Sequence, residues 1–190
     1  MRTCFGARRR SLVAREDLRS AAAPDGRADG RRGQPTPQAT IKLPPSPITV
    51  RPIEDSVWPA LCAYDAAAFG AERGTVLARL RGRLPAADLV AERNGRVAGF
   101  LLGRDGRVAV QAGPLIADDD AVARALLARA LDALPAPVFV DLADAKAEVR
   151  RWLEARGFSA VRPLTRMLYG RSQRYDDAAR TFAVVGPEFG

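Results

Sequence analysis

The sequence contains no histidine, only two cysteines and only two lysines among its 30 basic residues. Without histidine, Ser-His-Asp and Cys-His nucleophilic sites, HExxH metal sites and acid–base catalysis by imidazole are all excluded. Cys4 and Cys62 are too few for a zinc cluster or a disulfide framework, and they favour a reducing compartment. We therefore expect a cytoplasmic protein with no metal site, in which any catalysis uses Asp, Glu, Tyr, Arg or backbone groups.

Long hydrophobic runs are also missing from the chain. No stretch approaches 18 consecutive apolar residues, so the sequence predicts no membrane span. A chain of 190 residues with 47% hydrophobic content can nevertheless bury one sizeable core. We expect one folded domain with an appendage.

The formal net charge of +8 is concentrated near the N-terminus. Residues 1–47 hold ten basic and four acidic residues, whereas residues 48–190 hold 20 and 18 and are nearly neutral. Residues 1–47 also lack hydrophobic periodicity and end in a Pro-rich run, which favours a disordered Arg/Pro-rich leader outside the fold. This distribution disfavours nucleic-acid binding by the domain, and binding of RNA by the leader is the weakest of the functions considered.

Alternating strand and helix patterns begin at Ile48. The predicted order is a strand, two helices, a three-strand meander with a turn at Asn94-Gly95, a helix, a strand, a helix and two strands. Gly113-Pro114 is expected to end regular pairing of the third meander strand, because proline has no N–H to donate. The helix that begins after Asp118 to Asp120 is expected to bury one face. The predicted domain therefore spans residues 48–190.

This order of elements resembles the GNAT family of acyl-CoA-dependent N-acyltransferases. The string Val90–Phe100 looks like the second and third strands of that family, and Glu154–Phe158 looks like the end of its fourth helix and the start of its sixth strand. Ala112–Leu115 and Gly186–Gly190 look like the second half of its two-domain members. The resemblance implies a three-layer α/β fold, with a mixed central sheet of about six or seven strands and helices on both faces.

The resemblance also implies a function, with one alternative. The expected activity is transfer of an acetyl group from acetyl-CoA to an amine of a small molecule or peptide. The alternative is a non-catalytic module of the same fold that binds a ligand or a partner protein. A homodimer, or pairing with another GNAT domain, is compatible with either function.

The segment Gln111 to Asp120 stands where the family has its glycine-rich pyrophosphate loop. It offers one glycine, a proline and three carboxylates, although the loop normally uses backbone N–H groups at a helix start to bind phosphates. The resemblance implies acetyl-CoA contacts at Ala109, Gln111 and Gly113. Each like-charge contact near 4 Å costs about 1 kcal/mol even in water, so we expect the loop to be degenerate and the affinity weak.

Four further residues are candidates for the chemistry of acyl transfer. Asp141, near the end of a central strand where the two sheet halves would splay, is a candidate base, although a strand-end carboxylate bonded to loop N–H groups is the simpler interpretation. Tyr169 is a candidate acid for the leaving thiolate, or else an amphipathic rim residue. Tyr64 and Asp65 lie on the first helix, which in this family lines the acceptor pocket, so they are candidate acceptor contacts.

Overall fold

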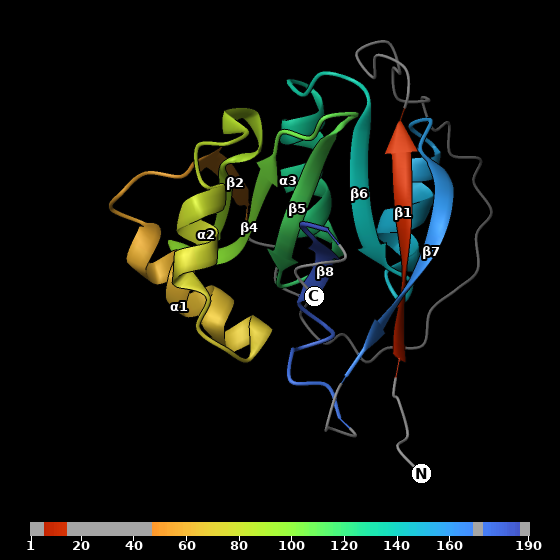
Figure 1. The fold of residues 1–190 in the computed structure, drawn as a ribbon. Coiled ribbons are helices and arrows are strands. Elements are labelled where there is room, and N and C mark those ends of the chain that lie inside the picture. Colours follow the sequence, from red (N-terminus) through yellow and green to blue (C-terminus); the bar gives the residue numbers. More distant parts are fainter. Residues whose placement is uncertain (1–5, 15–46, 169–172, 187–190) are drawn as a thin grey trace, which may run out of the picture.

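The computed structural model describes residues 6–14, 47–168 and 173–186 of the chain (Figure 1). The strands are β1 (Gly6–Ala14), β2 (Ile48–Pro52), β3 (Leu89–Arg93), β4 (Arg96–Arg104), β5 (Val110–Ala117), β6 (Val138–Ala143), β7 (Ser159–Met167) and β8 (Thr181–Val184). The helices are α1 (Trp58–Phe69), α2 (Gly74–Leu80), the short 3-10 helix η2 (Pro85–Ala87), α3 (Asp120–Leu131) and α4 (Ala147–Glu154). None of these helices is long and apolar enough to cross a bilayer.

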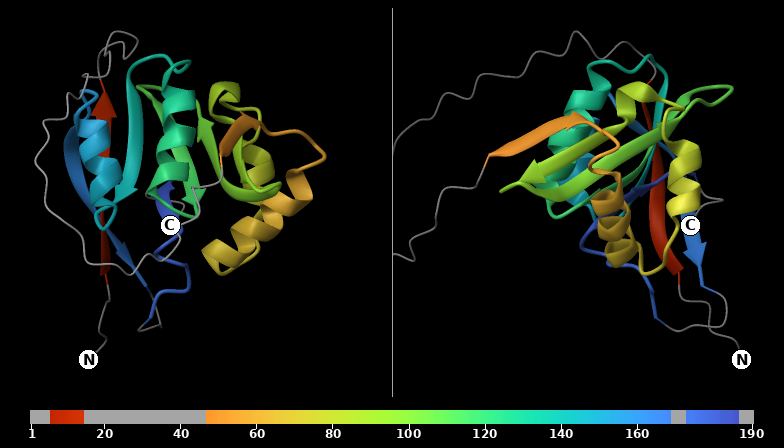
Figure 2. Two further views of the ribbon diagram at one scale, coloured as in Figure 1. Left: turned by 180° about the vertical axis from the view of Figure 1, so that it is seen from behind. Right: turned by 90° about the vertical axis from the view of Figure 1, so that its left-hand side faces the viewer.

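The eight strands of the described residues join one mixed sheet in the order β2-β3-β4-β5-β8-β6-β1-β7. Helices α1 and α2 cover one face of the sheet, and α3 and α4 cover the other (Figure 2). Each face has its own buried cluster, one built on α3 and α4 and the other on α1 and α2. This confirms the expected three-layer α/β class, with eight strands rather than six or seven.

Strand β1 corrects the prediction that residues 1–47 lie outside the fold. Residues 6–14 pair antiparallel with β6 on one side and with β7 on the other (Figure 1). Leu12 and Ala14 are buried in the cluster beneath α3 and α4, and Arg9 and Ser11 are buried as well. The basic run misled the sequence interpretation because β1 buries Arg9 and leaves Arg10 exposed, so a run of arginines is compatible with a strand of the sheet. The rest of the predicted leader, residues 1–5 and 15–46, lies outside the described residues.

The meander follows the predicted pattern up to Gly113-Pro114, where the prediction of a strand end is wrong. Leu101 pairs with Leu115 and Gly103 pairs with Ala112, so one residue of β4 faces two residues of β5. This is a β-bulge, and it accommodates a proline within a strand because the extra residue need not donate to the ladder. Strand β5 therefore continues past the proline to Ala117.

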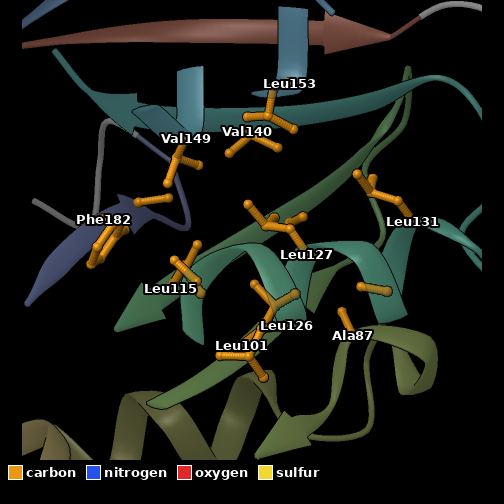
Figure 3. Packing of buried hydrophobic residues seen from close by; sticks show 14 of the residues in the cluster. Ala87, Leu101, Leu115, Leu126, Leu127, Leu131, Val140, Val149, Leu153 and Phe182 are labelled. Carbon is orange, nitrogen blue, oxygen red and sulfur yellow. The ribbon is translucent and has the colours of Figure 1, made fainter. Parts of the chain in front are cut away.

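Helix α3 packs as its hydrophobic spacing predicts. Its buried residues recur at helical intervals and face the sheet: Val122, Ala123, Leu126, Leu127, Ala130 and Leu131. Leu126 and Leu127 belong to the same cluster as Leu115 of β5 and Phe182 of β8 (Figure 3). This core fixes β5, β8 and the start of α3 relative to one another, and the segment expected to contact acetyl-CoA lies along β5 and at the start of α3.

Candidate functional site

Strands β5 and β6 run parallel and then separate, and β8 lies between them where they separate (Figure 1). The parallel pairing joins Val110 to Val138 and Gln111 to Phe139. Farther along the chain, Leu115 of β5 and Leu142 of β6 both pair with Ala183 of β8. Because β8 pairs with both neighbours, it occupies the facing edges of β5 and β6 at this point.

Side-chain contacts hold β8 in this position. Phe182 is 1% exposed and packs in the main core (Figure 3). Lys146, just before α4, places its ammonium 3.6 Å from the centre of the Phe182 ring and donates a hydrogen bond to the Ala179 carbonyl. A Cβ atom on Gly113 would lie 2.2 Å from the Val184 carbonyl oxygen. The absence of a side chain at Gly113 therefore allows β8 to lie close to β5.

Gly113→Ala is expected to destabilise the domain by about 1–3 kcal/mol, because the added methyl group meets backbone rather than a movable side chain. A loss of this size lowers the melting temperature by roughly 2–4 °C per kcal/mol in a chain of this length. Amide hydrogen exchange should accelerate most at Ala183 and Val184. Gly74→Ala is the control, since its φ angle is not positive and its Cβ would meet only the Cys62 Sγ, at an ordinary contact distance of 3.9 Å. Uniform acceleration in both variants would contradict a specific role for Gly113.

Carboxylate side chains of this chain occupy the start of α3. Asp119 is the N-cap residue: its Oδ1 accepts the Val122 N–H at 3.0 Å, and its Oδ2 lies 2.8 Å from Nη1 of Arg93. The Arg93 hydrogen bond holds the pKa of Asp119 below its usual range. Asp118 accepts a hydrogen bond from the Tyr64 hydroxyl at 2.8 Å. Both carboxylates therefore already have structural partners.

Asp119→Ala is expected to cost about 1 kcal/mol and roughly 2–4 °C in melting temperature, because the helix loses its cap. Asp119→Asn keeps the cap and loses the Arg93 ion pair, which is partly exposed, so its effect should be smaller. Thermal denaturation of the two variants measures the difference. Equal losses would show that the ion pair, rather than the cap, stabilises this helix.

An open groove of about 500 Å³ lies on the α1 side of the sheet. Its lining comes from β2, from the segment before α1, from α1 itself, and from the β3–β4 hairpin: Arg51, Ser56, Val57, Ala60, Tyr64, Glu92, Gly95, Arg96 and Val97. Glu92 accepts two hydrogen bonds from Arg51, at 3.2 and 2.9 Å. Of the candidate acceptor contacts, the structure brings Tyr64 to this groove, and Arg51 is a lining residue that was not predicted.

Tyr64 is in the groove but retains its proton. Burial and the hydrogen bond to Asp118 raise the pKa of its hydroxyl well above the usual value. The hydroxyl also lies 2.9 Å from the Ala98 carbonyl, a second acceptor. Tyr64 is therefore suited to hydrogen bonding and not to giving up a proton at neutral pH.

The other candidate residues are not brought together at the groove. Asp65 is 1% exposed and forms a bidentate pair with Arg73, at 2.7 and 2.9 Å. Asp141 is also 1% exposed, and its Oδ1 accepts a hydrogen bond from the Ser11 hydroxyl on β1. Gln111 and Gly113 lie within β5, and Ala109 lies in a bend directly before it. Tyr169 lies outside the described residues.

Comparisons with known proteins place these features in a family. Residues 61–183 match the family model described as an acetyltransferase (GNAT) domain. The chain belongs to the GNAT acetyltransferase family. No curated protein matches the chain significantly.

Three solved structures share the GNAT fold at low sequence identity. A protein assigned as an acetyltransferase from Pyrococcus horikoshii has a TM-score of 0.61 and 19% identity, over 98% of this chain and 53% of its own. A GCN5-related N-acetyltransferase from Sphaerobacter thermophilus has a TM-score of 0.54 and 16% identity, over 94% and 56%. An assigned GNAT-family protein from Novosphingobium aromaticivorans has a TM-score of 0.51 and 13% identity, over 87% and 65%. This GNAT chain thus spans less than two thirds of each structure.

Proposed function

We propose that this GNAT domain takes part in acetyl transfer to an amine as a half that does not itself hold acetyl-CoA. The observation that carries the proposal is the pairing of β8 with both β5 and β6 where these strands separate. The acceptor class that the family implies is a small-molecule or peptide amine. Acetyl-CoA would be held by another GNAT domain.

The residues along β5 do not fit acetyl-CoA. The pantetheine arm of the cofactor carries amide groups, which can bind an exposed strand edge in the manner of an added strand. From Leu115 onward, that edge of β5 is already paired with β8. At the start of α3, where phosphates would need free N–H groups, the Asp119 carboxylate occupies the Val122 N–H. The residues of this chain therefore do not support a transfer step from acetyl-CoA bound along β5.

The share of each solved chain that the match covers supports the involvement of a second GNAT domain. This chain covers 53% and 56% of the structures from Pyrococcus horikoshii and Sphaerobacter thermophilus, so each of those chains contains about as much sequence again. A domain without its own acyl-CoA site can still contribute an acceptor surface. The groove beside Tyr64 is the candidate for that surface.

Calorimetric titration of acetyl-CoA into the full chain tests the proposal. We expect no saturable heat, no release of free CoA with a panel of amines, and unchanged exchange protection at Ala183 and Val184. The matched variant is Asp119→Asn with Asp120→Asn, which removes two charges and keeps a capping side chain. It should not gain affinity, because β8 remains in place. Tight binding by either protein, or loss of protection in β8 on adding acetyl-CoA, would contradict the proposal.

A further inference from the structure

Three arginines from separate segments meet around a single buried carboxylate. Arg9 lies on β1, Arg166 lies on β7, and Arg174 and Asp176 lie in the segment that leads into β8. Arg174 donates to both oxygens of Asp176, at 3.1 and 2.6 Å, and Nη1 of Arg166 lies 2.8 Å from Oδ1. Arg9, Arg166 and Asp176 are only 4%, 9% and 7% exposed. We call these four residues the arginine cluster.

The arginine cluster contains more positive charge than Asp176 can neutralise. Three guanidinium groups and one carboxylate leave a net charge of +2. The adjacent pair Asp141 and Arg162, which both contact the Ser11 hydroxyl, adds one charge of each sign and leaves this balance unchanged. The cluster therefore lacks a counter-charge among these neighbours.

Buried donors in the cluster also lack acceptors. Both oxygens of Asp176 are already used by Arg174 and Arg166. Nη1 of Arg9 and Nη2 of Arg166 are buried and donate to no acceptor in the described part of the chain. Buried polar groups are normally satisfied, and buried charges are normally paired. Two such donors in one place indicate a missing acceptor.

Arg9 keeps its charge in this environment. Burial, together with the charges of Arg166 and Arg174, lowers the pKa of Arg9 to about 10. A group with that pKa is still protonated at neutral pH, so deprotonation does not relieve the excess charge. A bound anion would relieve it.

We propose that the arginine cluster binds a dianionic phosphate group, either inorganic phosphate or a phosphate monoester. Phosphate carries close to two negative charges at neutral pH and presents several acceptor oxygens. The planar guanidinium fork matches phosphate oxygens in a bidentate geometry. The side chain of Arg174 is 30% exposed, so it marks the side from which the anion enters. This site lies at β1 and β7, apart from the groove beside Tyr64.

The first test is thermal denaturation of the full chain in phosphate-free buffer with added inorganic phosphate, at an ionic strength kept constant with sodium chloride. At 100 times the dissociation constant, ligand linkage predicts a rise in melting temperature of roughly 5–10 °C. Arg9→Met should lose this rise in melting temperature. Without phosphate, the variant should melt at no lower a temperature than the unmodified protein, because the substitution removes an uncompensated buried charge. Arg10→Met is the matched control: Arg10 lies on the same strand, is exposed and pairs with Asp144. It should keep the full response.

A second variant covers the case in which Arg9→Met does not fold. Arg174→Gln, outside the sheet, should weaken phosphate binding at least tenfold by calorimetry, since it removes a charged hydrogen-bond donor. Glycerol phosphate is compared with inorganic phosphate: tighter binding of the ester identifies a monoester ligand, and equal binding identifies the free ion. No difference between phosphate and chloride for the unmodified chain would overturn the proposal. Equal responses of the unmodified chain and both cluster variants would also overturn it.

Discussion

Removal of residues 1–14 is expected to unfold the domain. Leu12 and Val13 are 0% and 3% exposed, and burial of each such side chain contributes about 1.5–3 kcal/mol. Strand β1 also supplies the sheet pairing of β7, which occupies the last position in the strand order. Since domains are stable by only about 5–15 kcal/mol in total, the deletion should remove most of that stability.

Circular dichroism and thermal melting of two truncated chains measure this effect. A chain that begins at Gly6 keeps β1 and should melt cooperatively near the temperature of the full chain. A chain that begins at residue 15 should show no cooperative transition. Leu12→Asp is the single-residue version, because it places an unpaired charge in the core. Similar melting of both truncated chains would show that β1 is dispensable.

Asp176→Asn should cause the second largest loss, about 3–5 kcal/mol. This substitution removes the only carboxylate of the arginine cluster and leaves three guanidinium groups facing one another, and breaking a buried ion pair by removing one partner has this cost. The melting temperature should fall by roughly 6–20 °C. Asp177→Asn is the control: that carboxylate is 38% exposed and pairs with Arg180, so its loss should cost at most about 1 kcal/mol.

Two further measurements identify the cause of the loss in Asp176→Asn. Adding Arg9→Met should recover part of the stability, since it reduces the repulsion among the arginines. Burial opposes ionisation of Asp176, but the Arg174 hydrogen bond and the Arg166 charge hold its pKa below the usual value. Its contribution is therefore present above about pH 4 and lost as the pH falls through the lowered pKa. The stability difference between the unmodified chain and Asp176→Asn should shrink in acid, and a constant difference would contradict this assignment.

The elements that follow from local pattern were predictable, and β1 was not. Asn94-Gly95 adopts positive φ angles of 55° and 71° at the predicted hairpin turn, because adjacent hydrophobic runs and a turn dipeptide act over a few residues. By contrast, the partners of Ser11 are Asp141 and Arg162, at sequence separations of 130 and 151. The four residues Ser11 to Ala14 next to three arginines give too short a pattern to indicate a strand.

The candidate site likewise combines features that local sequence predicts with features that depend on long-range pairing. The sequence predicts a helix that begins after Asp118 to Asp120, and Asp119 caps the helix that forms there. The last of the predicted strands appears as β8, but its place between β5 and β6 could not be inferred, because sheet order depends on the whole topology. Arg9 and Arg166 become one cluster only through the pairing of β1 with β7.

The position of β1 also has a consequence for synthesis on the ribosome. The strand is translated before every other described element, yet its neighbour β7 is completed only at Met167, roughly 150 residues later. At about 5–20 residues per second, β1 waits some 8–30 s for that partner. The β3–β4 hairpin pairs locally and can form early, whereas the half of the sheet that contains β8, β6, β1 and β7 assembles last. A nascent chain of this protein therefore carries β1 without its sheet partners through most of its translation.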